Sequence, residues 1–217
     1  MLVLHTKEVA EKWFGVACAA GGLVATAVSS TRAGTLGRLR KSLPPGVAQR
    51  IGDEERSDEI ERTLALLVEL EANEEGRKRF ALDPEYVAEP LASVLKVAAA
   101  IPLGYVTSYG NIAKASGAEA RDVGGIMASN PLYPIVPCHR VLGADLSLVG
   151  YAGSKGPEAL RAKLERLTRE AHGFEAEREL EVEGRTLKIY PVEWAIAKAE
   201  KRRASPGAQQ LLFDDWR

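Results

Sequence analysis

The sequence predicts an α+β protein, with a sheet in its N-terminal part and mainly helices in its C-terminal part. Apolar segments 15–20 and 23–29 flank Gly21-Gly22, a pair that supplies the positive φ angles of a tight β-hairpin turn. Beyond residue 86, helical patterns predominate. Of the 217 residues, 46% are hydrophobic and 27% are charged, a composition typical of a globular protein with a packed core.

The pattern divides the chain into four parts. Residues 1–85 form a supporting domain, whose end is marked by Asp83-Pro84. Residues 86–172 form a second domain that carries the candidate site. Residues 173–204 are an extension, and residues 205–217 are expected to be a flexible tail behind Ser205-Pro206-Gly207.

Two helices accompany the hairpin of the supporting domain. One is predicted over 35–43, where Pro44-Pro45-Gly46 stops it. The other is predicted over 58–72, because its apolar residues recur on one face and its charges on the other. Cys18 falls inside the first strand of the hairpin, where a small hydrophobic residue of the core is expected. The supporting domain therefore offers no candidate active site.

The second domain begins with an apolar helix over 90–100, followed by two short helices over 111–115 and 118–129. Ser116-Gly117 between the short helices predicts either a helix-turn-helix or a plain αα-corner. The last helix contains Gly124-Gly125, which costs about 1 kcal/mol for each Gly relative to Ala. Such glycines are tolerated where another backbone, of DNA or of a packed helix, must approach closely.

Cys138-His139 is the candidate catalytic pair, and it follows the apolar run 134–136, which predicts a short buried strand. A neighbouring imidazole can take the proton of a thiol and leave the nucleophilic thiolate. The alternative is a buried Cys with no chemical role. Adjacent residues on a strand point to opposite faces, so His139 would act only through a bend or a bridging water.

After the candidate pair, the sequence predicts a helix over 157–171, a hairpin over 179–190 centred on Gly184, and a helix over 193–203. The net charge is −1, so any positive surface for DNA must be local. Two cysteines give neither a disulfide framework nor zinc-ligand spacing. No signal peptide or membrane span is apparent, which predicts a soluble, cytoplasmic protein. Neither a metal nor a cofactor is expected. Three Asn and three Gln against 23 Glu and 18 Arg suggest a thermophilic source.

Three motifs in order resemble those of the O6-alkylguanine-DNA alkyltransferases, or methylated-DNA–protein-cysteine methyltransferases. They are Gly104 to Tyr109, Arg121 to Gly125 followed by Asn130-Pro131, and Pro137-Cys138-His139-Arg140. The resemblance covers about residues 88–168. It implies a ribonuclease-H-like supporting domain and a winged-helix-like helix-turn-helix domain. It also implies a monomer that takes the alkyl group of O6-alkylguanine, and less well of O4-alkylthymine, from double-stranded DNA onto Cys138, once per molecule.

The resemblance also implies a role for each matching residue. His139 would take the thiol proton through a water and would be oriented by Glu165, fourteen residues after Tyr151. Asn130 would shape the turn before the site, and Tyr109 would protonate the leaving guanine. Tyr151 and Ala152 would wall the base pocket, and Arg121 would fill the space left by the flipped base. The remaining residues expected to face DNA are Tyr109, Gly110, Ala120, Gly124 and Gly125.

The sequence departs from the family at three places. Ala128 stands where many members carry a basic residue, which puts one phosphate contact in doubt. Ala152 replaces a small hydroxyl residue, and Lys155-Gly156-Pro157 replaces the commoner loop, so the preferred alkyl group is open.

The C-terminal residues resemble a sliding-clamp binding peptide, through Gln209, Leu212, Phe213 and Trp216, although no single register fits fully. The alternative is a tail that packs on its own domain. For the whole protein, the alternatives to the transferase are a non-transferring protein that binds alkylated bases and flags them, and a thiol hydrolase or helix-turn-helix regulator.

Overall fold

The structure is a computed structural model that describes residues 1–74 and 80–204. It contains two compact units, and the α+β class is confirmed. The first unit comprises residues 1–99 and 130–136, and the second comprises residues 100–129 and the chain from 137 onward. This division differs from the boundaries predicted at residues 85 and 172. The helix before residue 100 groups with the first unit, and the extension after residue 172 groups with the second.

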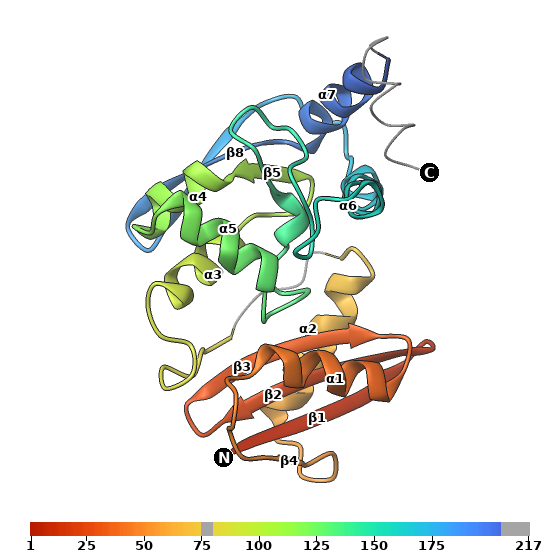
Figure 1. Cartoon of the computed structure of the whole chain (residues 1–217), viewed down its shortest axis with the longest axis vertical. Coiled ribbons are helices and arrows are strands. Elements are labelled where there is room, and N and C mark those ends of the chain that lie inside the picture. The colour runs from red at the N-terminus through yellow and green to blue at the C-terminus, as the bar shows by residue number, and fades with distance from the viewer. Residues whose placement is uncertain (75–79, 205–217) are drawn as a thin grey trace. The chain divides into compact units, whose positions relative to one another are not determined.

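A four-stranded sheet in the order β3-β2-β1-β4 forms the base of the first unit (Figure 1). β1 (Leu2–Val9), β2 (Lys12–Ala19) and β3 (Gly22–Ser29) are antiparallel neighbours, and β4 (Gln49–Ile51) is parallel to β1. The predicted hairpin is confirmed as β2 and β3. The sequence did not indicate β1, because the polar His5 and Thr6 in its middle are both buried and break the apolar pattern.

Helices α1 (Arg32–Ser42) and α2 (Asp58–Glu71) confirm the two predicted helices and cover opposite faces of this sheet. Gly15 lies against the side chains of α1, whereas Lys7, which pairs with Phe14, reaches Glu61 of α2. Side chains alternate between faces along a strand, so adjacent residues 14 and 15 point to different helices. The third helix of this unit is α3 (Leu91–Ala99), also as predicted.

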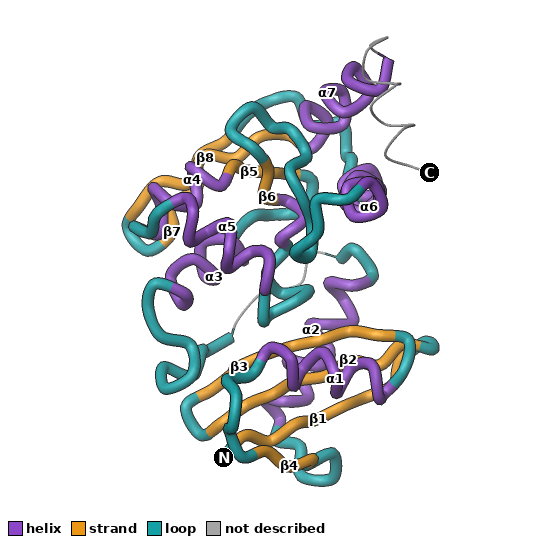
Figure 2. Tube along the Cα trace, viewed as in Figure 1, coloured by secondary structure: helices purple, strands orange, loops and turns teal. Residues whose placement is uncertain are grey.

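The second unit is built on a second four-stranded sheet in the order β6-β5-β8-β7 (Figure 2). β5 (Tyr105–Ser108) is parallel to β6 (Val141–Leu142) and antiparallel to β8 (Arg185–Pro191), which pairs with β7 (Arg178–Val182). The hairpin of the extension is therefore confirmed. β5 was not expected, because four residues between a loop and a helix give no periodic pattern.

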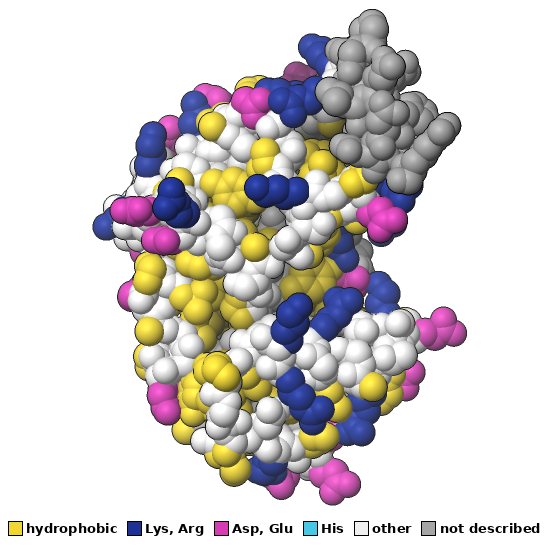
Figure 3. Space-filling view, viewed as in Figure 1, with side chains coloured by type: hydrophobic (Ala, Val, Ile, Leu, Met, Phe, Trp, Pro, Cys, Tyr) yellow, Lys and Arg dark blue, Asp and Glu magenta, His cyan; other side chains and the backbone are white. Residues whose placement is uncertain are grey.

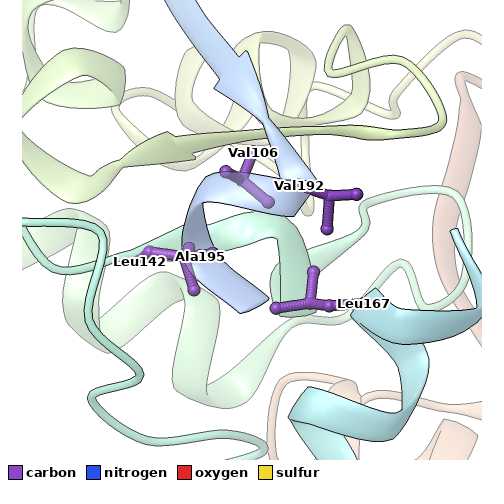
Figure 4. Close-up of a cluster of buried hydrophobic side chains, with 5 residues drawn as sticks. All are labelled: Val106, Leu142, Leu167, Val192 and Ala195. Carbon is purple, nitrogen blue, oxygen red and sulfur yellow. The ribbon is translucent and has the colours of Figure 1, made fainter. Parts of the chain in front are cut away.

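The described residues of this unit also form the α-helices α4 (Tyr109–Ser116), α5 (Ala120–Ser129), α6 (Pro157–Arg169) and α7 (Val192–Ala204). A buried cluster joins β5, β6, α6 and α7 (Figure 4); it consists of Val106, Leu142, Leu167, Val192 and Ala195. The extension therefore contributes to the core of the unit that carries the candidate site. Among the described residues, no helix is both long and apolar enough to span a bilayer.

The predicted strand over 134–136 is wrong, because these residues lie in turns. The three prolines at positions 131, 134 and 137 lack the N–H donors that a strand ladder needs. Instead, Asn130 Nδ2 donates to the carbonyl of Val136 at 2.8 Å, and Leu132 N donates to Asn130 Oδ1 at 3.1 Å. Ile135 and Val136 are nevertheless fully buried, so the apolar run correctly marked burial but not the strand.

Candidate active site and nucleic-acid interface

Cys138 begins a short 3₁₀ helix, η1 (Cys138–Arg140), and is 6% exposed. A helical turn replaces the predicted strand end, and it supplies the bend that adjacent thiol and imidazole groups need. The thiol lines a cavity of about 400 Å³, a size typical of small-molecule sites. Walls of the cavity come from α4, α5 and the loop before α6; they include Tyr109, Ala120, Arg121, Gly124, Met127, Ala128, Tyr151, Ala152 and Lys155.

His139 is held by a buried carboxylate, Glu170. The distance between His139 Nε2 and Glu170 Oε1 is 2.6 Å. Arg140 donates to the same carboxylate from Nε at 2.7 Å and from Nη2 at 2.9 Å, and its Nη1 donates to the carbonyl of Ile101 at 2.8 Å. All three side chains of this network are buried, so the imidazole and the carboxylate have little freedom to move.

The electrostatics of the network fix which nitrogen of His139 can act as a base. Burial lowers the pKa of His139 to about 4, although the hydrogen bond to Glu170 opposes this. Burial alone would raise the pKa of Glu170, but the hydrogen bonds from His139 and Arg140 outweigh it and lower that pKa to about 2. An ionised carboxylate only accepts, so Nε2 of the neutral imidazole carries the hydrogen. His139 Nδ1 is then a buried acceptor, and it has no hydrogen-bond partner in the described structure.

The carboxylate that orients the histidine is therefore Glu170 and not the predicted Glu165. Glu165 is exposed on the outer face of α6. Counting fourteen residues from Tyr151 assumed a loop of fixed length before the helix. Helical phase is a better guide, because Lys163, Leu167 and Glu170 follow the i, i+4, i+7 spacing of one buried face.

Lys163 is a site residue that the sequence interpretation missed. Its side chain is fully buried, and Nζ donates to the carbonyls of Val141 at 2.7 Å and Gly150 at 2.9 Å. Burial lowers the pKa of Lys163 to about 8, while Cys138 close by acts in the opposite direction. Because Val141 follows η1 and Gly150 precedes Tyr151, this ammonium group ties the nucleophile segment to the loop that walls the cavity.

Tyr151 and Ala152, the residues predicted to wall a base pocket, lie in a tight turn that lines the cavity. Tyr151 N donates to the carbonyl of Ser154 at 2.8 Å, and Ser154 N returns the bond to Tyr151 at 2.9 Å. Ala152 has a φ of 49° and Gly153 a φ of 79°, so both central residues are left-handed. A side chain is uncommon in that region, and such strain is often found at functional sites.

A short turn around Gly117 joins α4 and α5, as expected of both a helix-turn-helix and a plain αα-corner. Ser108 caps α4 by accepting from Asn111 N, and Gly117 ends it with a φ of 81°. Tyr109 lines the cavity, and burial, together with the charge of Cys138, raises its pKa. Arg121 and Ala120 are exposed at the start of α5, beside the cavity mouth, and Gly110 is half-buried at the start of α4.

Gly124 and Gly125 face open space. A β-carbon built on either residue would meet no atom within 4 Å. Tight packing of α5 against another part of the described chain therefore does not explain these glycines. The open face of α5 leaves room for the approach of another backbone.

Asn130 occupies the turn that precedes the nucleophile. Its side chain bonds the carbonyl of Val136 and the amide of Leu132, which fixes the backbone that leads into Pro137 and Cys138. Among the residues that the structure describes, no group of three or more His, Cys, Asp or Glu side chains is placed to hold a metal ion. The clamp-peptide residues 209–216 lie outside the described part of the chain.

A protein-family model matches residues 90–172, the segment that holds the thiol, the histidine network and the α4–α5 pair. That segment is similar to the 6-O-methylguanine DNA methyltransferase DNA binding domain. The resemblance expected over about residues 88–168 is thereby confirmed.

Curated relatives of this methyltransferase-like segment carry matching names. The methylated-DNA–protein-cysteine methyltransferase of Pyrobaculum aerophilum is 55% identical over 53 residues, which are 24% of this chain and 36% of that protein. The protein of the same name from Mycobacterium leprae is 46% identical over 68 residues, or 30% of this chain and 41% of that protein. The matched part of the chain thus spans about two fifths of the length of these relatives.

Solved structures extend the likeness to most of the chain. A single-residue variant of the Mycobacterium tuberculosis O6-methylguanine methyltransferase is 27% identical, with a TM-score of 0.52, and covers 80% of this chain and 97% of its own. A crystal structure of Mycobacterium tuberculosis OGT in complex with DNA is 25% identical, with a TM-score of 0.52. The match covers 76% of this chain and 94% of that one. A likeness over about four fifths of the chain is longer than residues 90–172, so it extends beyond the methyltransferase-like segment.

Proposed function

We propose that the protein repairs DNA by transferring the alkyl group of O6-alkylguanine in duplex DNA to Cys138, and less readily that of O4-alkylthymine. The observation that carries the proposal is one cavity with the thiol of Cys138 in its lining and the open face of α5 at its rim. The similarity of residues 90–172 to a methyltransferase DNA-binding domain supports the same conclusion.

In the first step, His139 Nδ1 accepts the Cys138 proton through a bridging water, since Nδ1 is the only acceptor the imidazole retains. The thiolate attacks the alkyl carbon, the S–C bond forms, and the C–O6 bond breaks with its electron pair on the guanine. Tyr109 donates a proton to the leaving guanine and regains one from solvent, to which the His139 imidazolium releases its own. The raised pKa of Tyr109 keeps its hydroxyl protonated until then. The thioether product is stable, so each molecule acts once.

The substrate must leave the base stack, because a paired guanine cannot present O6 to a buried thiol. The cavity receives the flipped nucleotide between Tyr109 and the Tyr151–Ala152 turn. Helices α4 and α5 act as a helix-turn-helix: Arg121 enters the duplex at the vacated position, while Gly124 and Gly125 let the DNA backbone approach α5. Flipping costs a few kcal/mol, which these contacts offset.

The proposal is tested by the intact mass of the protein after incubation with a duplex that contains O6-methylguanine. We expect a gain of one methyl group in the wild type and in Cys18→Ala, and none in Cys138→Ala. Cys18 is the matched control because it is the other cysteine, placed in β2 with a pKa raised mainly by burial. Binding without a mass gain would instead favour a damage-flagging protein, and repeated turnover would favour a hydrolase.

The proposal includes the partners expected from the sequence. The protein acts as a monomer on the chromosome inside the cell, and residues 209–216 bind a sliding clamp. A pull-down with the clamp tests the second point, since deletion of residues 205–217 should abolish capture and leave methyl uptake from duplex DNA unchanged. Equal capture of the full and truncated chains would contradict it.

A further inference from the structure

The β7–β8 hairpin lies outside the segment matched to the methyltransferase DNA-binding domain, yet it packs on α4 (Figures 1 and 2). Thr107 Oγ1 and Asn111 Nδ2 both donate to the carbonyl of Lys188, at 2.6 and 3.3 Å. β8 also continues the sheet of β5, which leads directly into α4. The hairpin is thus fixed relative to the two short helices.

The strand register places Arg185 on the buried face of the hairpin. Val182 pairs with Arg185 and Leu180 with Leu187, so these side chains share one face, and Leu187 is fully buried. At the tip, Glu183 and Gly184 both have positive φ, as in a two-residue turn that keeps this register. Arg185 lies next to the tip, where the core face ends and the turn between α4 and α5 begins.

The guanidinium of Arg185 lies against Gly117, the left-handed residue between α4 and α5. A β-carbon on Gly117 would overlap Nη1 of this guanidinium. Only three positions separate Gly117 from Ala120 at the start of α5. Arg185 therefore presents a positive charge at the turn that leads into the helix proposed to contact DNA.

Two acidic residues of strand β7, Glu179 and Glu181, lie on the other face of the hairpin. Glu179 pairs in register with Lys188, and Glu181 pairs with Thr186 and accepts a hydrogen bond from it at 2.8 Å. Lys188 in turn forms an ion pair with Glu177 at 2.7 Å. The charge of Arg185 is therefore separated from these carboxylates by the two strands themselves.

The α4–α5 pair and the strand before it carry no net positive charge of their own. Residues 105–129 contain two basic side chains, Lys114 and Arg121, and two acidic ones, Glu119 and Asp122, so their formal charges cancel. In the upper part of Figure 3, Lys and Arg side chains are scattered among uncharged surface and Asp or Glu side chains. Affinity for duplex DNA depends mainly on cations that neutralise phosphates. A cation from elsewhere in the unit must supply part of it.

We propose that the β7–β8 hairpin is a second DNA-binding element, whose Arg185 binds a backbone phosphate next to the turn between α4 and α5. The inference rests on the proposed function in one respect, that duplex DNA is the partner. It assigns a role in DNA binding to the hairpin of the extension, which lies outside the matched segment 90–172.

The test is the affinity of the full chain for a short unmodified duplex, measured by fluorescence anisotropy between roughly 50 and 200 mM salt. Arg185→Ala should weaken binding about tenfold, as expected for one charge-assisted phosphate contact. The slope of log K against log salt should fall in magnitude by about 0.9. Lys188→Ala is the matched control, because it removes one cation from the opposite face of the same hairpin, and its affinity should stay within about twofold.

A duplex series with single neutral methylphosphonates locates the contact. One substituted phosphate should weaken the wild type and leave Arg185→Ala unaffected. Unchanged affinity and salt slope in a folded Arg185→Ala variant would overturn the inference, as would equal losses in both variants or no duplex binding by the wild type. If Arg185→Ala weakens duplex binding as expected but the wild type takes up no methyl group, the role of the hairpin is retained. Only the proposed function is then overturned.

Discussion

At the scale of single residues, the His139–Glu170–Arg140 network makes the clearest prediction. Glu170→Gln replaces an ionised acceptor with an amide that no longer fixes the imidazole tautomer, so we expect methyl uptake to slow by about tenfold to a hundredfold. Glu165→Gln changes the exposed carboxylate on the same helix and should have no effect. Single-turnover rates with methylated duplex compare the two variants. Slow methyl uptake by Glu165→Gln together with a normal rate in Glu170→Gln would contradict the assignment of Glu170 as the orienting carboxylate.

Lys163 makes a second prediction at this scale. Lys163→Met keeps most of the volume but leaves the buried carbonyls of Val141 and Gly150 without their donor. Each unsatisfied group costs about 1–3 kcal/mol, so the melting temperature should fall clearly. Methyl uptake should also slow, because the loop that walls the cavity is no longer tied to the nucleophile segment. Lys163→Arg, which retains a donor, should recover part of both losses; no difference between Met and Arg would argue against this role.

At the scale of elements, the glycines of α5 lower the stability of the helix but are proposed to be needed for DNA binding. Gly125→Ala should raise the free energy of unfolding by about 1 kcal/mol, because the added methyl meets no neighbour within 4 Å. It should also lower the rate of methyl uptake from duplex DNA, since the methyl fills space needed by the DNA backbone. Reaction with free O6-methylguanine should be unaffected, because Gly125 does not line the cavity.

Gly37 in α1 provides the control for that prediction. A β-carbon on Gly37 also meets nothing within 4 Å, so Gly37→Ala should give a similar gain in stability. It belongs to the first unit and not to the helix proposed to contact DNA, so its methyl uptake should match the wild type. Equal uptake by both variants would refute the role of the open α5 face.

Elements with a strong periodic pattern were predictable from sequence, and those set by tertiary contacts were not. The helix at 58–72 and the hairpin around Gly184 have clear patterns and appear nearly as expected. β5 forms only because β6 and β8 flank it, and η1 follows a turn fixed by Asn130. Cys138 and His139 could be selected by residue type. Counting residues from Tyr151 missed Glu170, whereas the helical phase of the buried Lys163, Leu167 and Glu170 would have indicated it.

At the scale of the whole molecule, the buried network predicts how stability depends on pH. His139 has its pKa lowered from 6.5 to about 4, and Glu170 from 4.5 to about 2. Both groups bind protons more weakly in the folded than in the unfolded protein. Their contribution to the free energy of unfolding is therefore complete above the unfolded pKa and is lost as the pH falls. The loss from His139 falls between pH 6.5 and 4 and amounts to about 3 kcal/mol, and Glu170 adds a loss below pH 4.5.

Urea unfolding at a series of pH values measures this dependence. The free energy of unfolding should decline steadily below pH 6.5 in the wild type. His139→Asn lacks this proton uptake, so its decline between pH 6.5 and 4.5 should be smaller than that of the wild type. What remains there is expected from the buried His5, whose pKa is also lowered by burial. A wild-type stability that is level between pH 6.5 and 4.5 would contradict a buried, neutral His139.

The route of the chain has a consequence for how such a protein could be assembled from parts. Residues 130–136 group with the first unit, where Thr26 N donates to the carbonyl of Pro131 and Thr26 Oγ1 to that of Tyr133, both at 2.8 Å. The nucleophile follows two residues later, in the other unit. A single cut in the gene therefore cannot separate the units, and a fusion that exchanged residues 1–99 alone would remove the partner strand of the segment leading to Cys138. An exchange between related genes would therefore have to transfer the coding sequence of both units together.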